Sequence, residues 1–191
     1  MLILGICKAT KSLGQLVGLD KTYEATLHLG AVSDTYDRTG KITESNINCQ
    51  VSNVPSVLKQ FTGTLQQIPP MYSAKKVGGK KLYELARQGI EIERKPMKVT
   101  IYELYTLPLT SSHEGREDLV SIYVHCSSGT YIRSLAHDIG QTLGCGAYLE
   151  ELRRTAIGQF RVEKAIALAE LTIENIASRI HVQLSLPNKS E

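Results

Sequence analysis

A strand, a turn and a helix follow one another in the segment VHCSSGTYIRSLAHDIG, residues 124–140, and this unit constrains the fold most. Its first residues alternate like a strand, Ser128-Gly129 has turn character, and the residues that follow have helical spacing. Arg133 falls on the first helical turn, beside Ile132 and Leu135. Because an unpaired buried charge is costly, the segment predicts an anionic partner for Arg133.

Short strand patterns and short helical patterns are interspersed along the chain. Residues 23–30, YEATLHLG, alternate as in a half-buried strand. Several strands follow each other through tight turns, which favours an α+β fold with a mixed, largely antiparallel sheet flanked by helices. We also expect a buried strand or core segment at 1–11, a turn or short hairpin at 33–42, a hairpin turning at 78–79, strands at 118–127 and 156–162, and helices at 53–61, 80–89, 147–155, 164–171 and 172–180.

Composition bounds the class of protein. With 191 residues, 42% of them hydrophobic and 21% charged, the chain is long enough for one sizeable soluble domain. No apolar run approaches the ~20 residues that span a membrane, and the short apolar opening lacks the basic flank of a signal peptide. We therefore expect no membrane partner.

The cysteines give no sign of a covalent or metal framework. Cys7, Cys49, Cys126 and Cys145 are scattered without CxxC spacing, which predicts neither a disulfide framework nor a zinc ribbon and fits a reducing cytoplasm. His125 and Cys126 are adjacent on a predicted strand, so their side chains point to opposite faces. We expect no metal site.

Basic residues are concentrated locally, although the net charge is only +3. The segment 71–98 holds eight basic residues against three acidic ones, and Arg153-Arg154 forms a second cluster. Such surfaces suit a polyanion partner, but alone they are more often simply solvated helix and loop faces. Each candidate site residue, taken alone, also has a non-functional interpretation. Tyr23 and Leu152 fit positions in a hydrophobic core, and Arg133 fits the exposed edge of a helix.

Three dense blocks, at 20–40, 63–104 and 126–160, together change this interpretation. They contain DKTY, QIPPMYSAKKV, GTYIRSL and LRRT, in the order and approximate spacing found in the bacterial TruB-type tRNA pseudouridine-55 synthases. The chain resembles that family over roughly residues 1–171. The resemblance implies a pseudouridine-synthase catalytic domain, incomplete at its N-terminus, with 172–191 as a C-terminal helix and tail and no full C-terminal RNA-binding domain.

The resemblance also implies a reaction and a set of site residues. A uridine of the tRNA T loop is flipped out and isomerised to pseudouridine by an aspartate nucleophile, without a cofactor. Tyr23 matches the catalytic tyrosine that stacks on the base and assists proton transfer, and Arg133 the arginine that pairs with the aspartate. Tyr131 matches a substrate-contacting residue and Leu152 a pocket wall. Phosphate contacts are expected from Lys75, Lys76, Lys80, Lys81, Arg153 and Arg154.

One family feature is missing from the printed sequence. The nucleophile lies in a GTLDPxATG-like segment, which the 191 residues do not contain, so we expect it upstream of Met1. Asp20, Asp34, Asp37 and Asp138 are poor substitutes by their positions. We therefore expect the 191-residue chain alone to be a catalytically inactive monomer. Three readings stay open: a synthase whose polypeptide starts further upstream, an inactive RNA-binding remnant and, less favoured, a guide-dependent synthase.

Overall fold

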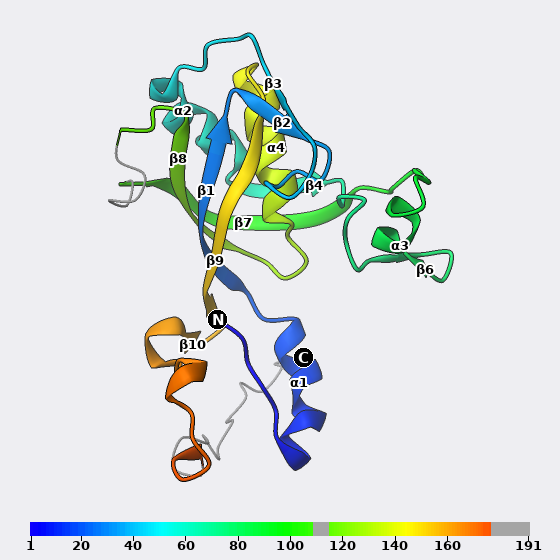
Figure 1. Ribbon diagram of the computed structural model, residues 1–191, viewed down its shortest axis with the longest axis vertical. Coiled ribbons are helices and arrows are strands. Elements are labelled where there is room, and N and C mark those ends of the chain that lie inside the picture. The colour runs from blue at the N-terminus through cyan, green and yellow to red at the C-terminus, as the bar shows by residue number, and fades with distance from the viewer. Residues whose placement is uncertain (109–114, 177–191) are drawn as a thin grey trace.

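The computed structural model describes residues 1–108 and 115–176 and is built on one six-stranded sheet (Figure 1). The strand order is β10-β9-β1-β8-β7-β4, and every neighbouring pair is antiparallel. The predicted α+β class with a largely antiparallel sheet is confirmed. The strands of this sheet are β1 (Lys21–Leu29), β4 (Gly63–Gln67), β7 (Met97–Leu107), β8 (Leu119–Cys126), β9 (Ala147–Ile157) and β10 (Phe160–Arg161).

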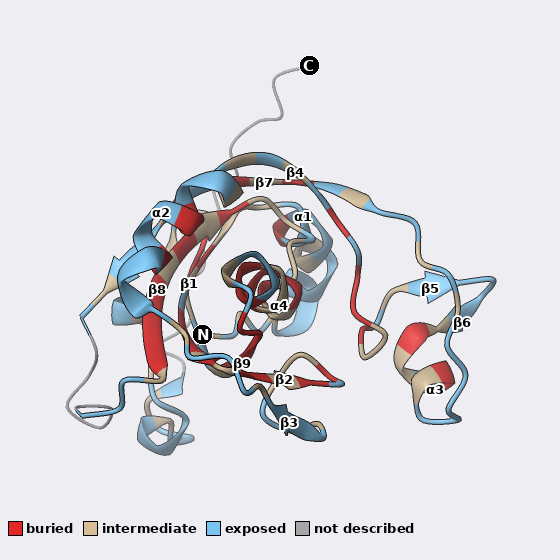
Figure 2. Cartoon of the chain, turned by 90° about the horizontal axis from the view of Figure 1, so that it is seen from above, coloured by how far each residue is buried: buried red, intermediate tan, exposed pale blue. Residues whose placement is uncertain are grey.

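The sheet curls around one helix, α4 (Ile132–Leu143), as Figure 2 shows from above. The predicted alternation of β1 explains this packing, since Ala25, Leu27 and Leu29 are all buried in one cluster with residues of α4. From α4, the cluster takes Ile132, Leu135, Ala136 and Ile139. The helix ends at Gly144, whose φ of 81° is left-handed and therefore favours glycine.

Shorter elements surround this core. The predicted helix after Asn53 is present, and it buries Val54, Val57 and Leu58. The predicted hairpin at Gly78-Gly79 and the helix after it form a basic lobe, residues 75–95, that stands apart from the sheet (Figure 1). These smaller elements are α1 (Leu13–Val17), β2 (Ala31–Ser33), β3 (Ile42–Glu44), α2 (Val54–Leu58), β5 (Lys76–Val77), β6 (Lys80–Lys81) and α3 (Leu82–Ala86).

The predicted helix at 147–155 is wrong, because these residues form strand β9. AYLEELRRT has good helix formers, but its backbone pairs with β1 from Leu29↔Ala147 to Lys21↔Ile157. Tertiary pairing thus overrides local propensity. The predicted strand at 156–162 is split by Gly158 between the end of β9 and β10.

Both ends of the chain also depart from expectation. Residues 1–6 form no strand, Leu2 and Leu4 are more than 70% exposed, and a 3-10 helix covers Cys7–Ser12. The predicted helix at 164–171 contains only a 3-10 turn, Leu168–Glu170. Of the predicted helix at 172–180, the part after residue 176 lies outside the described residues, as does most of the predicted tail.

A disulfide joins Cys49 to Cys145, which corrects the expectation that the cysteines form none. The two residues are 96 positions apart in sequence, so spacing alone does not reveal the pair. The bridge ties the segment before α2 to the turn between α4 and β9. Cys7 and Cys126 are free, the first exposed and the second buried. Within the described ranges, no helix is long and apolar enough to cross a bilayer.

Candidate active site

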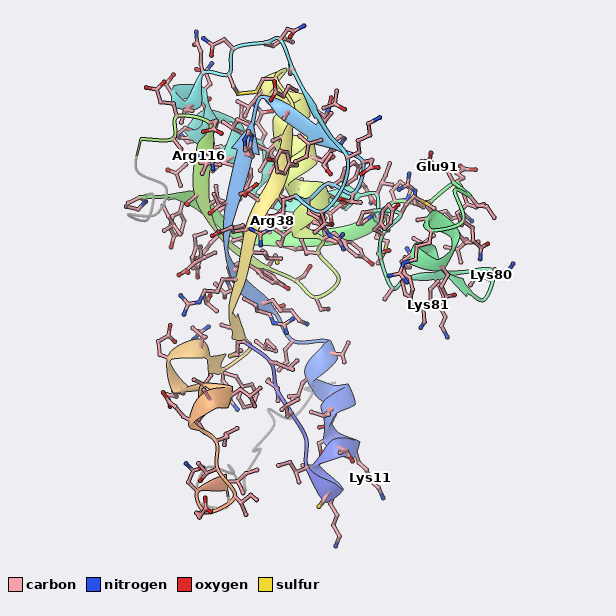
Figure 3. All side chains as sticks on the ribbon, in the orientation of Figure 1. Lys11, Arg38, Lys80, Lys81, Glu91 and Arg116 are labelled. Atoms are coloured by element: carbon pink, nitrogen blue, oxygen red, sulfur yellow. A yellow bond between two sulfur atoms is a disulfide. The ribbon has the colours of Figure 1, made fainter. Side chains whose placement is uncertain are left out.

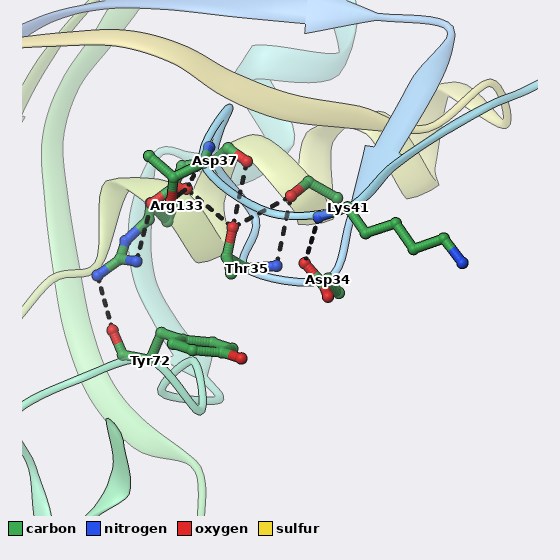
Figure 4. Close-up of polar contacts among 8 residues, drawn as sticks. Asp34, Thr35, Asp37, Lys41, Tyr72 and Arg133 are labelled. Carbon is green, nitrogen blue, oxygen red and sulfur yellow. Dashed lines mark hydrogen bonds and ion pairs between the residues drawn. The ribbon is translucent and has the colours of Figure 1, made fainter. Parts of the chain in front are cut away.

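Arg133 projects from the first turn of α4 and pairs with Asp37 (Figure 4). Its Nη1 donates to Asp37 Oδ2 at 2.9 Å, and its Nη2 donates to the backbone carbonyl of Tyr72 at 2.8 Å. Asp37 thus supplies the anionic partner expected for Arg133, whereas the expectation that the catalytic nucleophile is a different aspartate stays a prediction. Sequence position suggested a turn residue in Asp37, and the turn itself carries the carboxylate to the helix.

Asp37 is held as a carboxylate by several donors. Its Oδ1 accepts from Thr35 Oγ1 at 2.8 Å and from both the N–H and the hydroxyl of Thr39, at 3.0 and 2.5 Å. Burial alone raises the pKa of Asp37, but the bonds from Thr39 and Thr35 and the charge of Arg133 outweigh it. The net pKa lies below its usual value, so Asp37 is ionised at neutral pH.

The turn that presents Asp37 is tightly built. Asp34 Oδ1 accepts from the N–H of Lys41 at 2.8 Å, which closes the turn (Figure 4). A Cβ at Gly40 would collide with the side-chain oxygens of Ser33, Asp34 and Thr35, so a larger residue there would displace the side chains that build the turn. The predicted turn at 33–42 is confirmed, and Gly40 leaves room for its close packing.

A second set of bonds holds the start of α4 against residues 67–72. The Gln67 side chain accepts from the N–H of Tyr131 at 2.8 Å and donates to the Tyr131 carbonyl at 3.0 Å. Ser134 Oγ donates to the carbonyl of Ile68 at 2.9 Å. Arg133 completes the set through Tyr72, so the helix start and the base of the basic lobe are fixed together.

An open cavity of about 880 Å³ lies over the Arg133–Asp37 pair. Leu152 lines it and is 47% exposed, which fits a pocket wall better than a core position. Arg38 and Arg153 also line it, and Figure 3 shows Arg38 near the centre of the molecule. The structure thus brings together three of the predicted site residues, Arg133, Leu152 and Arg153.

Tyr23 and Tyr131 are not among the residues that line this cavity. Tyr23 lies on β1, half-buried against the core, with the guanidinium of Arg154 near its hydroxyl. Burial raises the pKa of Tyr23, and Arg154 opposes the shift only in part. The phenol is therefore protonated at neutral pH. Tyr131 is the N-cap residue of α4, where its backbone is engaged by Gln67.

The six predicted phosphate contacts differ in availability. Lys76 and Lys80 are exposed on the basic lobe, whereas Lys75 and Lys81 are half-buried, and Lys81 Nζ donates to Tyr83 at 3.2 Å (Figure 3). Arg153 is 66% exposed and lies 3.7 Å from Glu24. Arg154 is turned inward and donates to the carbonyl of Met1.

Two acidic residues have surroundings that their positions in the sequence do not reveal. Asp37 belongs to the site, and the signal was its position in a Thr-rich turn, SDTYDRTG, which supplies donors to a carboxylate. Asp138, on the helix after Arg133, is half-buried, and burial raises its pKa to about 6. A lone, partly desolvated carboxylate of this kind destabilises the folded chain at neutral pH.

Two family models together match almost the whole chain. The "TruB family pseudouridylate synthase (N terminal domain)" matches residues 1–132, and the "tRNA pseudouridylate synthase B C-terminal domain" matches residues 133–181. The chain belongs to the TruB family. The boundary between the two models falls inside α4, and β9 from the second half pairs with β1 from the first, so one sheet joins both matches.

Curated relatives of the TruB chain share close to half of its residues. It is 46% identical over 181 residues to tRNA pseudouridine synthase B of Dechloromonas aromatica, a match that covers 93% of this chain and 58% of the relative. The enzyme of the same name from Clostridium acetobutylicum is 44% identical over 193 residues, covering 99% and 65%. The TruB chain thus spans about three fifths of the length of these relatives.

Solved structures show the same fold. A crystal structure of a Cbf5-Nop10-Gar1 complex contains a chain 28% identical to this one, with a TM-score of 0.61 over 87% of this chain and 39% of that one. A structure of an H/ACA RNP bound to a substrate RNA containing 2'-deoxyuridine matches at 26% identity and a TM-score of 0.55, covering 86% and 37%.

Proposed function

We propose that this chain forms part of an enzyme that isomerises the T-loop uridine at tRNA position 55 to pseudouridine. The observation that carries the proposal is the Arg133–Asp37 pair, which underlies an open cavity on a TruB-family frame. In this reaction the bond from C1′ to N1 of the uracil breaks, a bond from C1′ to C5 forms, and the proton of C5 is lost. Residues 1–171 then form part of the catalytic domain.

Asp37 is the counter-ion of Arg133 in this proposal, and the nucleophile is a second carboxylate. A carboxylate offers about four lone-pair positions. Asp37 already accepts three hydrogen bonds on Oδ1 and one on Oδ2, so both oxygens are held by donors and only Oδ2 keeps a free lone pair, which makes Asp37 a poor nucleophile. Arg133 uses only two of its five N–H groups in the bonds named above, which leaves donors for the incoming carboxylate.

The remaining site residues receive roles by their chemistry. Leu152 provides an apolar wall for the extruded base. Tyr23 does not line the cavity in this structure, so its stacking on the base as a neutral phenol requires the ring to turn toward the cavity when RNA is bound. Tyr131 contacts the substrate from the start of α4. The exposed Lys76, Lys80 and Arg153 approach phosphates of the T stem-loop, with Lys75, Lys81 and Arg154 as less accessible contributors.

Release of tritium from uridine labelled at C5 tests the proposal directly, since isomerisation must expel that hydrogen. A T-stem-loop RNA is incubated with the 191-residue chain and with the same chain extended upstream in its reading frame. We expect release only from the extended chain. Release from the 191 residues alone would place the nucleophile within them, and an Asp37→Asn variant would then show whether Asp37 supplies it.

No release from either chain, together with retained binding of the RNA, would favour the inactive RNA-binding remnant instead. An inactive remnant that only binds RNA would depend on the basic lobe and not on the Arg133–Asp37 pair. Equal affinity of the Arg133→Ala variant and the unmodified chain for the RNA would therefore be expected under both readings. Turnover alone separates them.

A further inference from the structure

The residue before Asp37 has an uncommon backbone conformation and an unusual neighbour. Tyr36 has a φ of 63°, in the left-handed region that L residues with bulky side chains rarely adopt. Its ring is stacked on the imidazole of His137, with centroids 4.1 Å apart and planes inclined by 14°. The function proposed above uses neither residue.

His137 lies one helical turn after Arg133, so both side chains leave the same face of α4. Tyr36 and Asp37 are adjacent in the turn opposite. Two successive residues of the turn are thus engaged by two successive turns of one helix, Asp37 through an ion pair of 2.9 Å and Tyr36 through the ring stack.

Strand β9 fixes the same residues from the backbone side. The carbonyl of Tyr36 accepts from the N–H of Leu149 at 3.0 Å, and the N–H of Arg38 donates to the carbonyl of Leu149 at 3.1 Å. Asp37 sits between these two bonds. Its backbone is therefore clamped to β9, while the direction of its carboxylate depends on the left-handed turn at Tyr36.

The imidazole of His137 is suited to stacking and to little else. Its Nδ1 is buried and has no hydrogen-bond partner within the described part of the chain. Burial lowers the pKa of His137, so the ring is neutral and adds no second cation beside Arg133. A buried ring nitrogen without a partner is costly, which indicates that the ring is kept for its face.

We propose that Tyr36 and His137 are positioning residues, whose ring stack holds the turn at residue 36 and so aligns the Asp37 carboxylate with Arg133. The stack fixes a conformation that would otherwise call for glycine. Without it, the turn relaxes toward ordinary backbone angles and the carboxylate moves away from the guanidinium. The consequence for catalysis rests on the proposed function, whereas the consequence for Asp37 does not.

The pKa of Asp37 in the 191-residue chain, measured by carboxyl carbon NMR, tests this alignment without any catalysis. His137→Ala and Tyr36→Asn both remove one ring, and asparagine tolerates the left-handed conformation, so the second variant isolates the ring from the backbone. His137→Phe and Tyr36→Phe are the matched controls that keep two rings. We expect the pKa of Asp37 to rise by about 0.5 unit or more in the ring-loss variants and to stay unchanged in the controls.

Three outcomes would overturn the inference. The first is that the ring-loss variants lower the melting temperature but leave the pKa of Asp37 unchanged, which would give the ring stack a purely structural role. The second is that His137→Phe raises the pKa of Asp37 as much as His137→Ala does, which would show that the imidazole itself, and not the ring stack, keeps this pKa low. The third is that Tyr36→Asn leaves the pKa of Asp37 unchanged while His137→Ala raises it, which would show that Tyr36 has no part in positioning Asp37.

Kinetics of the upstream-extended chain provide the second readout. Loss of either ring is expected to lower kcat about tenfold with KM within about twofold, since a misaligned pair affects the reaction and not RNA binding. A change confined to KM contradicts the inference. Should even the unmodified extended chain release no tritium, the proposed function fails, while the NMR result decides the role of the stack independently.

Discussion

Gln67 and Tyr131 exchange two hydrogen bonds, so the end of strand β4 is joined to the N-cap residue of α4 by a single side chain. Gln67 is only 3% exposed, and its amide satisfies both backbone groups of Tyr131. The helix therefore begins at a fixed point relative to the sheet, two residues before Arg133.

Gln67→Leu is expected to lower the free energy of unfolding by about 1–3 kcal/mol, because the N–H of Tyr131 loses its partner, whereas the Tyr131 carbonyl still accepts from the N–H of Leu135. Gln67→Glu keeps an acceptor for the N–H and loses the donor to the carbonyl, so its effect should be intermediate. Urea denaturation measures both. Gln66→Leu, at the exposed neighbouring position, is the control, and equal destabilisation by Gln66→Leu and Gln67→Leu would refute the role of this bridge.

Arg133→Ala in the upstream-extended chain is expected to reduce turnover about 100-fold or more while RNA affinity changes less than about threefold. Arg133→Lys should rescue little, because an ammonium on a flexible stem cannot reproduce the fixed fork that reaches Asp37 and Tyr72 together. Arg161→Ala, an exposed change of equal charge, is the control. If Arg133→Ala instead weakened binding with steep salt dependence, Arg133 would be a phosphate contact.

The ionisation of Asp37 contributes stability that depends on pH. Its folded pKa lies below the unfolded value of ~3.9, so the contribution is complete above that pH and disappears as pH falls through the folded pKa. Asp37→Asn should therefore destabilise the chain by about 1–3 kcal/mol at pH ~7, and the difference should shrink below pH ~4. Thermal melts across this range measure it.

Asp138→Asn is the control for that experiment, because its effect on stability at neutral pH should have the opposite sign. Burial raises the pKa of Asp138 to about 6, so its charged form is disfavoured in the folded chain and the penalty is present above that pH. The variant should be more stable than the unmodified chain at pH ~8 and equal to it below pH ~4. A gain for Asp37→Asn at neutral pH would contradict the assignment of Asp37 as a stabilising counter-ion.

Reduction of the Cys49–Cys145 bridge is expected to lower the free energy of unfolding by about 3–5 kcal/mol, because it closes a long loop. Urea midpoints with and without dithiothreitol measure the loss. Cys49→Ser should abolish sensitivity to the reductant, and Cys7→Ser, at an exposed free cysteine, should retain it. A chain that unfolds identically with and without reductant would show that the bridge contributes nothing.

Replacing Lys76 and Lys80 together by glutamine should weaken RNA binding and reduce the slope of log K against log salt by about 2, roughly one for each lost phosphate contact. Turnover at saturating RNA should stay the same. The control is Lys8→Gln with Lys11→Gln, which removes two exposed charges at the far end of the molecule (Figure 3). Equal salt slopes for the two double variants would show that the basic lobe has no special role.

Much of the fold follows from local sequence patterns. The alternation in β1, the Gly78-Gly79 hairpin and the helix after Asn53 all act over a few residues, and all three were predicted correctly. β9 was missed because its helix-forming residues are recruited into the sheet by a partner more than 100 positions away. The Cys49–Cys145 pair was missed for the same reason of distance.

In the candidate site, too, local motifs predict some features, whereas others depend on contacts between distant segments. The motifs identify Arg133 and Leu152, and the structure brings both to one cavity. What the motifs do not reveal is that a turn at 33–40 delivers Asp37 to the helix, or that Gln67 holds the N-cap of α4. These contacts depend on how β9, the turn and α4 meet in three dimensions, which no local pattern encodes.

The central position of β1 has a consequence for biosynthesis. Both neighbours of this strand, β8 and β9, are made about 100 residues or more after it. At about 5–20 residues per second, the strand waits roughly 10 seconds on the ribosome with both edges unpaired. During that interval its apolar face, Ala25, Leu27 and Leu29, is available to chaperones and to other nascent chains. We therefore expect the nine residues of β1 to be the part of the sheet that most needs protection during translation.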